Sequence, residues 1–394
     1  MQCAAWALLA LGLVACGGGA SSAAGGAGGG EPGGAGMSGT SGAGGAASGA
    51  GGGSGAAGGS GAAGGSSCAP APDLGVRYVG RVDGCNAAGA RYAWPGSGFV
   101  GRFSGTGLSV KLTDSGNYHS VLIDGQLAPP LLTSGAKSYP LAADLADGEH
   151  TFEVYRRTEA SFGVTLVEGF EVTGGQLLSP PPPPARRIEI VGDSISCGYG
   201  NEGTAPCTFS AETENNYLAY GSVLARSLQA ESSTVAISGK GVIYNYGGSK
   251  VLPLPVVYDT VFPDDRKHPW SFEWQADAVI VNLGTNDFSG TTDPTDQLFT
   301  DTYTTFLEHV RSVYPNAFIL CTVGPMLSGS DLDTARTDIA AAVDARKAAG
   351  DERVKAYSMT TLNPAPACDS HPNLMTHAAM AAELEVELRA DLSW

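Results

Sequence analysis

Four short segments in the second half of the chain carry side chains suited to acyl transfer. They read Gly-Asp-Ser at residues 192–194, Ser-Gly-Lys-Gly at 238–241, Gly-Thr-Asn-Asp at 284–287 and Cys-Asp-Ser-His-Pro-Asn at 368–373. A serine hydroxyl is a poor nucleophile until a base removes its proton. Ser194 is the candidate nucleophile, His371 is the candidate base, and Asp369 is the candidate partner that holds the imidazole in one tautomer.

Acyl transfer also needs hydrogen-bond donors already in place for the tetrahedral oxyanion. The backbone N–H groups of Ser194 and Gly239 and the side-chain amide of Asn286 would supply three. Glycine suits the second position because the backbone must approach the substrate closely. Tyr244 and Tyr246 follow this glycine in the chain, and their rings are candidates for lining a substrate cleft, although core packing is the commoner use of such rings.

The strands that would position these segments are short apolar runs at residues 188–191, 233–237, 278–282 and 317–322. Continuous apolar runs are typical of parallel strands that are buried on both faces. Helical patterns lie between and after them; the clearest ends at Pro315, and the last carries Met380, Leu384 and Leu388 on one stripe. Residues 186–394 are therefore predicted to form an α/β three-layer domain with a parallel sheet, whose chemistry gathers at the carboxyl ends of the strands.

Residues 73–179 have a different pattern. Short alternating runs recur at residues 98–103, 108–112 and 119–123, and the Asp-Gly pair at 124–125 is a hairpin signal. Many short strands with glycine-rich turns indicate an all-β sandwich of the jelly-roll type. The linker at residues 180–185 begins with five prolines, which form a stiff extended spacer between the two domains.

The N-terminal part of the chain predicts export. The apolar stretch in residues 1–16 is too short to span a bilayer and is typical of a signal peptide, and its end, Leu-Val-Ala-Cys, resembles a lipoprotein cleavage box that makes Cys16 the lipidated residue. Residues 17–72 are dominated by Gly, Ala and Ser and read as a flexible tether. We expect an outer-membrane or cell-surface lipoprotein. Because no Lys or Arg precedes the apolar core, ordinary secretion with cleavage near Ala20 is the alternative.

Six cysteines remain after Cys3 and Cys16 are set aside, and an even number in an exported protein indicates disulfides. The sequence leaves the pairing open. We expect Cys197–Cys207, because both follow the candidate nucleophile, then Cys321–Cys368, because each is placed in a predicted loop beside the site, and Cys68–Cys85 by elimination. The cysteines show no Cys-x-x-Cys spacing and no cluster with histidine, so no structural metal is expected.

Composition excludes some classes of partner. The 394 residues contain 22 Lys plus Arg against 39 Asp plus Glu, a net charge of −17, and no basic run of five or more residues. This acidic balance argues against nucleic acid or an anionic membrane surface as a partner. Contact with a membrane is expected only through the lipid anchor, and we expect a monomer.

The four segments, in this order, resemble the SGNH or GDS-type hydrolase superfamily, which is named after a Ser, Gly, Asn and His in such blocks. Over nearly all of residues 74–394 the chain is similar to family 2 carbohydrate esterases, which pair a jelly roll with an SGNH domain. The similar runs are residues 94–99 (Trp-Pro-Gly-Ser-Gly-Phe), 142–144, 147–152, 192–200, 322–326 (Thr-Val-Gly-Pro-Met) and 368–372 (Cys-Asp-Ser-His-Pro). The resemblance implies removal of O-acetyl groups from plant-type polysaccharides such as xylan and glucomannan, with an acetylated polysaccharide or oligosaccharide as partner and no metal or organic cofactor.

Two questions stay open in the sequence. Many SGNH hydrolases have Asp three residues before the His, where this chain has Cys368, and Asp369 stands two before. Family 2 esterases resemble this arrangement, which leaves either a triad with Asp369 or a dyad in which a backbone carbonyl orients His371. The alternatives for the function are a general SGNH esterase or lipase acting on other acyl esters, and a non-catalytic surface protein that binds glycan.

Two further polar residues receive structural interpretations. Asp287 is expected to hydrogen-bond within its own loop, as aspartates in turns do. His377 falls inside the last predicted helix, where a surface or capping role is expected.

Overall fold

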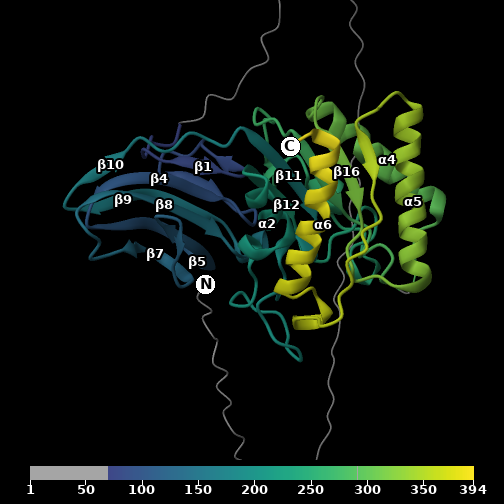
Figure 1. Cartoon of the computed structure of the whole chain (residues 1–394), viewed down its shortest axis with the longest axis horizontal. Helices are drawn as coiled ribbons and strands as arrows, with labels where there is room; N and C mark the ends of the chain where they lie inside the picture. The colour runs from purple at the N-terminus through teal and green to yellow at the C-terminus, as the bar shows by residue number, and fades with distance from the viewer. Residues whose placement is uncertain (1–69, 291) are drawn as a thin grey trace, which may run out of the picture. The chain divides into compact units, whose positions relative to one another are not determined.

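The computed structural model describes residues 70–290 and 292–394 (Figure 1). The predicted signal peptide, Cys16 and nearly all of the predicted tether lie outside the described residues. Antiparallel strands occupy the first part and a parallel α/β arrangement follows, so the predicted order of a β-sandwich and an SGNH-type domain is confirmed. Within the described residues, no helix has both the length and the apolar character needed to cross a bilayer.

The sandwich is one strongly curved antiparallel sheet with the strand order β1-β4-β8-β5-β9-β3-β2, to which β10 adds on β4, and β6 and β7 add on β5. Its core gathers apolar side chains from alternate positions, among them Phe99, Phe103 and Phe152. The elements are β1 (Arg77–Val79), β2 (Val82–Asp83), β3 (Ala90–Tyr92), β4 (Gly98–Gly105), β5 (Gly107–Ile123), β6 (Gln126–Leu127), β7 (Leu131–Ala142), β8 (Gly148–Arg156), η1 (Ala160–Phe162), β9 (Thr165–Thr173) and β10 (Gln176–Leu178).

Strand β5 is long and bent, and its two halves pair with different neighbouring strands, which curves the sheet toward a barrel. Its residues 107–113 pair with β9, and its residues 119–123 pair with β8. The strand bends between these stretches, where its pairing with β7 also shifts register.

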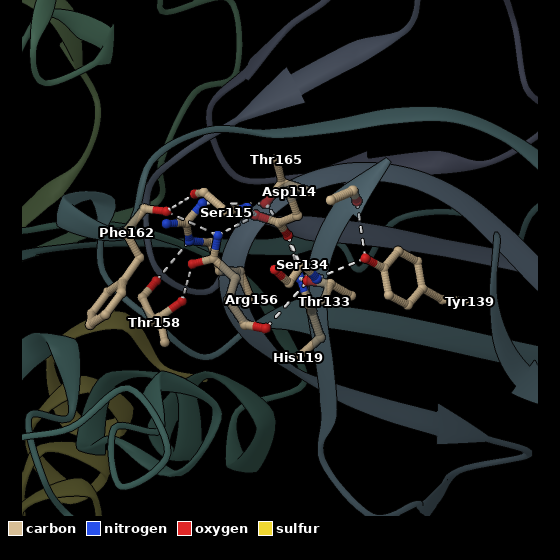
Figure 2. Close-up of polar contacts among 12 residues, drawn as sticks. Asp114, Ser115, His119, Thr133, Ser134, Tyr139, Arg156, Thr158, Phe162 and Thr165 are labelled. Atoms are coloured by element: carbon tan, nitrogen blue, oxygen red, sulfur yellow. Dashed lines mark hydrogen bonds and ion pairs between the residues drawn. The ribbon is translucent and has the colours of Figure 1, made fainter. Parts of the chain in front are cut away.

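A buried polar cluster fills the bend (Figure 2). Asp114 accepts hydrogen bonds there from the hydroxyls of Thr133 (2.7 Å) and Thr165 (3.0 Å), and His119 Nε2 lies 3.0 Å from the same carboxylate. The Arg156 guanidinium belongs to this cluster and donates to Thr165 Oγ1 at 3.3 Å. The cluster satisfies buried polar atoms that would otherwise destabilise the sandwich.

The α/β part is built on a parallel sheet of β11 (Arg186–Gly192), β12 (Ala230–Ala236), β15 (Ala278–Asn282), β16 (Phe318–Thr322) and β17 (Val354–Ala356). The strand order is β12-β11-β15-β16-β17. Alternate side chains face opposite ways, so that Val279 and Val281 of β15 join one apolar core while Ala278 and Ile280 join the other. This alternation explains why both faces need helices.

Helices α2 (Tyr220–Ser227) and α6 (Leu374–Leu392) pack on one face of the sheet, and α4 (Asp296–Val313) and α5 (Gly329–Ala348) pack on the other (Figure 1). This is the three-layer arrangement that the sequence predicts. Short elements complete the domain: α1 (Ser194–Cys197), η2 (Asn216–Leu218), η3 (Tyr246–Gly248), α3 (Leu254–Val257), β13 (Thr260–Phe262), β14 (Asp265–Pro269) and η4 (Cys368–Ser370).

A fully buried ion pair joins the two parts. Arg81, in the turn between β1 and β2, donates to Glu189 of β11 at 3.1 Å, and neither side chain is exposed. The hydroxyls of Tyr258 and Tyr314 also donate to the Glu189 carboxylate. Burying both charges carries a desolvation penalty, and the several hydrogen-bond partners of each group offset it.

Candidate active site

Three neighbouring strands end level at one edge of the sheet. Gly192 of β11 lies in register with Ala236 of β12 and with Asn282 of β15. The chain leaves these strands in the loops that carry Ser194, Gly239 and Asn286. The structure therefore brings together at one edge the segments that the sequence places after separate strands.

Ser194 and His371 form a hydrogen-bonded pair across this edge. Ser194 is the first residue of α1, directly after the turn at Asp193, and only 7% of it is exposed. His371 Nε2 lies 2.8 Å from Ser194 Oγ. His371 Nδ1 donates to the backbone carbonyl of Asp369 at 3.1 Å, which leaves Nε2 free of a proton and able to accept one from the serine.

The side-chain role predicted for Asp369 is not what the structure shows. The residue has a left-handed backbone (φ 48°), and this turn presents its carbonyl, not its carboxylate, to His371. The carboxylate instead accepts hydrogen bonds from Tyr199 Oη and from the backbone N–H of Phe209, both at 2.9 Å. Of the two arrangements that the sequence leaves open, the structure has the dyad with a backbone carbonyl.

This arrangement predicts that Asp369→Asn lowers kcat/KM by less than about tenfold, because the carbonyl that orients His371 is unchanged. Asparagine is the fitting replacement since it tolerates a left-handed backbone and keeps an oxygen that can accept from Phe209 N–H. Steady-state hydrolysis of 4-nitrophenyl acetate measures the effect. A loss comparable to that of His371→Ala would show that the Asp369 side chain takes part in a catalytic triad.

An aromatic stack that the sequence analysis missed supports the histidine. The Tyr199 ring stacks on His371, with ring centroids 4.0 Å apart, and on Phe209 at 4.2 Å. The only signal in the sequence was an aromatic residue between two glycines just after the candidate nucleophile. The stack holds the imidazole plane and removes it from water, and this burial lowers the pKa of His371 below the ordinary value of 6.5.

The lowered pKa of His371 has a defined consequence for activity. Only the neutral imidazole can accept the serine proton, so the rate falls as pH drops through this pKa. We expect the acid limb of the kcat/KM profile to have its midpoint below pH 6.5. Tyr199→Ser should move the midpoint upward by exposing the ring, whereas Tyr199→Phe should leave it in place. A wild-type midpoint above pH 6.5 would contradict the assignment.

Asn286 links the two loops that carry the other candidate oxyanion donors. Its Nδ2 donates to the carbonyl of Lys240 at 2.9 Å, next to Gly239, and makes only a long contact of 3.4 Å with Asp193, next to Ser194. An oxyanion would replace Asp193 as acceptor of the longer and weaker of these two bonds. Gly239 has φ 76°, a conformation that favours glycine, and this explains the residue type in the second loop.

Two buried aspartates hold the loops that carry these donors. Asp193 accepts from the backbone N–H of Ile195 at 3.0 Å and caps α1, and burial raises its pKa to about 7. Asp287 accepts from three consecutive backbone N–H groups at residues 242–244, at 2.8–2.9 Å. The carboxylate also takes a hydrogen bond from its own backbone N–H, as expected within its loop, but its other bonds reach the loop after β12 and tie the second segment to the third.

The remaining sequence candidates fall in different surroundings. Tyr246 is 73% exposed, and its backbone N–H donates to the Gly239 carbonyl at 2.8 Å, so it stands beside the second loop. The Tyr244 ring lies 4.8 Å from the ammonium of Lys250. The surface role expected for His377 is wrong: the residue is fully buried, its Nδ1 accepts from Tyr220 N–H at 3.1 Å, and burial lowers its pKa to about 3.

The disulfide pairing differs from two of the expected bridges. Cys207 is bonded to Cys368, while Cys197 and Cys321 are free, buried thiols. The Cys197–Cys207 and Cys321–Cys368 predictions are wrong because Cys197 is buried in α1, where its thiol donates to Glu159, and Cys321 is buried inside strand β16. The predicted Cys68–Cys85 bridge includes a residue outside the described part of the chain and stays a prediction.

The observed bridge joins the loop after the nucleophile to the loop of the histidine. The backbone N–H of Asp369 also donates to the Cys207 carbonyl at 3.0 Å. Gly203 packs so closely that a Cβ there would overlap the sulfur of Cys368. The bridge therefore fixes the backbone that leads into Asp369, whose carbonyl orients His371.

Removing this bridge should cost stability more than catalysis. It spans 161 residues of sequence, and Cys207→Ala with Cys368→Ala should lower the free energy of unfolding by about 2–5 kcal/mol, while kcat at 20–25 °C stays within about tenfold. Thermal denaturation measures the stability, hydrolysis of 4-nitrophenyl acetate measures kcat, and a mass map of the non-reduced digest identifies the bridge. Cys321→Ala is the matched control and should leave the bridge intact. Recovery of linked Cys197 and Cys207 peptides would overturn the pairing.

One group of side chains among the described residues could offer three ligand atoms to a metal ion. Glu159, Cys197 and Glu214 are buried, and their ligand atoms lie within 4.8 Å of one another. Two of them already have protein donors: Glu159 Oε2 accepts from Ser238 N–H at 2.7 Å, and Glu214 Oε2 accepts from Glu159 N–H at 3.0 Å. We therefore assign this group a hydrogen-bonding role.

Comparison with known proteins identifies the class and then the family. Residues 190–380 match the model of the GDSL-like lipase/acylhydrolase family, and residues 78–182 match the carbohydrate esterase 2 N-terminal model. The fold is thus that of the GDSL class of acylhydrolases. A solved structure of a family two carbohydrate esterase from Clostridium thermocellum in complex with cellohexaose is 36% identical, covers 81% of this chain and 99% of that chain, and has a TM-score of 0.78. The chain belongs to carbohydrate esterase family 2.

Two named relatives extend the comparison. The cellulase/esterase CelE of Acetivibrio thermocellus is 36% identical over 329 residues, which are 81% of this chain but only 40% of CelE. The acetylxylan esterase/glucomannan deacetylase of Cellvibrio japonicus is 29% identical over 332 residues, which are 82% of this chain and 91% of that protein.

Proposed function

We propose that this protein is a serine esterase that removes O-acetyl groups from plant-type polysaccharides such as xylan and glucomannan. The observation that carries the proposal is the 2.8 Å contact between Ser194 Oγ and His371 Nε2, at a sheet edge where a backbone carbonyl holds the other ring nitrogen. The name of the Cellvibrio japonicus relative, an acetylxylan esterase/glucomannan deacetylase, supports this class of substrate.

The geometry accounts for each step of such a reaction. His371 Nε2 takes the proton of Ser194 as Oγ attacks the acetyl carbon, and the oxyanion is met by Ser194 N–H, Gly239 N–H and Asn286 Nδ2. When the tetrahedral intermediate collapses, the ester bond breaks and the sugar oxygen receives the proton from His371. A water molecule then attacks the acetyl carbon as His371 takes its proton. The bond between Ser194 Oγ and the acetyl carbon breaks, His371 returns the proton to Oγ, and acetate leaves.

The histidinium formed during the reaction is stabilised by a backbone carbonyl and not by a carboxylate. The carbonyl of Asp369 is a dipole that accepts from Nδ1–H at 3.1 Å. A dipole stabilises the positive ring less than a full negative charge does. The fixed turn at Asp369 and the Tyr199 stack therefore contribute mainly by holding the orientation of the ring.

The experiment that tests the function compares acyl groups and polymers. We expect hydrolysis of 4-nitrophenyl acetate faster than of the butyrate ester, and release of acetate from acetylated xylan and acetylated glucomannan, with Ser194→Ala as the blank. Preference for butyrate would favour a general esterase or lipase. Binding of glycan with no turnover by the wild type would favour a glycan-binding protein. The Clostridium thermocellum enzyme in complex with cellohexaose is the reason to test this role.

We also propose that the protein is exported and anchored through a lipid on Cys16. The sequence at residues 13–16 and the Gly-, Ala- and Ser-rich tether that follows support this placement. Metabolic labelling with a palmitate analogue should mark the wild type. A Cys16→Ala variant that still takes the label would contradict lipidation at Cys16 and favour ordinary secretion.

A further inference from the structure

The β-sandwich places one buried carboxylate at the catalytic edge of the parallel sheet. Glu159 lies just after β8, at the N-cap position of η1, and is 3% exposed. Its side chain makes no capping bond to that helix. Glu159 Oε2 instead accepts from the backbone N–H of Ser238 at 2.7 Å, so a residue of the sandwich bonds the loop that follows β12.

The same oxygen touches both loops of the site. Ser238 directly precedes Gly239, the candidate oxyanion donor, and the bond to Glu159 holds the Ile237–Ser238 peptide, which is one peptide before the one that carries the Gly239 N–H. Cys197 Sγ, in the short helix that begins at Ser194, lies 3.8 Å from Glu159 Oε2 and donates to it. One oxygen thus ties the nucleophile helix to the oxyanion loop. Small displacements of such loops are costly, because oxyanion donors act only in a narrow geometry.

The backbone of Glu159 is itself held by hydrogen bonds at both its N–H and its carbonyl. Its backbone N–H donates to Glu214 Oε2 at 3.0 Å, and its carbonyl accepts from Arg156 Nη2 at 2.8 Å. Arg156 also donates to the carbonyl of Thr158 at 2.9 Å and belongs to the buried polar cluster of the sandwich, where Thr165 and Asp114 lie beside it (Figure 2). The bonds of Arg156 to the carbonyls of residues 158 and 159 therefore fix the turn that presents Glu159.

We infer that Glu159 is a positioning residue of the hydrolase site, supplied by the sandwich, which keeps the Ser238–Gly239 loop in register with Ser194. This inference rests on the proposed esterase function. The sandwich would then be needed for the chemical step itself, and its contribution would be visible with an ester too small to require glycan binding. Burial raises the pKa of Glu159, and either protonation state leaves an oxygen able to accept from Ser238 N–H.

The test compares three replacements of Glu159 in the full chain with 4-nitrophenyl acetate. Glu159→Ala removes the acceptor and should lower kcat by about 10–100-fold, with KM within about threefold, because the oxyanion exists only after attack. Glu159→Gln keeps an oxygen at the same reach and should stay within about threefold of wild type. Glu159→Asp keeps the charge but withdraws it by one methylene, so it should be slower than Glu159→Gln.

The control separates positioning from stability. Thr133→Val alters the same buried sandwich cluster without touching residues 194–240, and it should lower the melting temperature while kcat stays within about twofold. If Glu159→Ala does not fold, the inference is tested by whether kcat of Glu159→Gln exceeds kcat of Glu159→Asp. Equal kcat for wild type, Asp and Gln variants, or a change confined to KM, would overturn the inference. A wild type no faster than Ser194→Ala would instead sink the proposed function.

Discussion

Replacing Ser194 by alanine is expected to lower kcat/KM for 4-nitrophenyl acetate by about 10⁴–10⁶-fold, and His371→Ala should cost a similar factor. Each residue is useless without the other, because the hydroxyl attacks only as His371 Nε2, 2.8 Å away, takes its proton. The double variant should therefore be hardly slower than either single variant. Steady-state rates, corrected for uncatalysed hydrolysis, measure all three.

Ser196→Ala is the matched control for this pair of variants. Ser196 lies on the same short helix, but its hydroxyl is paired with Tyr220 Oη at 2.8 Å. Its loss should leave kcat within about tenfold while removing a buried hydrogen bond. A Ser194→Ala enzyme that stays within about tenfold of wild type would remove this serine from the reaction and the proposed mechanism with it.

The second large effect is expected at Asn286. Asn286→Ala should lower kcat by about 10²–10³-fold with little change in KM, because its amide meets a charge that exists only in the transition state and the intermediate. Ser289→Ala, in the same loop, changes only a weak contact of 3.4 Å to the Asn286 carbonyl and serves as control. A fall in kcat/KM that comes wholly from KM would assign Asn286 to substrate binding instead.

The parallel domain could be predicted from sequence because its signals are local. Strands buried on both faces read as unbroken apolar runs, and the observed β11, β12, β15 and β16 overlap the four predicted runs. The loops with Ser194, Gly239 and Asn286 follow three of these strands directly, so their meeting at one edge follows from the sheet being parallel.

Two elements of the domain gave no such signal. Helix α5 buries Ala335, Ile339, Ala342 and Val343 in a segment otherwise rich in Ala and Asp, so its apolar stripe is faint. Strand β17 has only three residues, Val354–Ala356, at the edge of the sheet. Helix α5 is set by packing against α4 and β16, and β17 by pairing with β16, and local periodicity reports neither.

The errors at the site have one physical origin. Which cysteines meet depends on the directions of side chains across 161 residues of sequence, and the role of Asp369 depends on a single left-handed turn. Glu159 approaches the site from the other domain, 35 positions before the nucleophile. None of these features produces a pattern among neighbouring residues. The loop residues that directly follow a strand do produce one, and they could therefore be predicted.

Trapping the acyl-enzyme tests the central claim most directly. Wild-type protein would be mixed with 4-nitrophenyl acetate, quenched in acid within the first turnovers, digested and mapped by mass spectrometry. The proposed mechanism predicts one acetyl group on the peptide that contains Ser194, and none on the same peptide from Ser194→Ala. Turnover in the wild type with acetyl found on another residue, or with the label unchanged in Ser194→Ala, would contradict it.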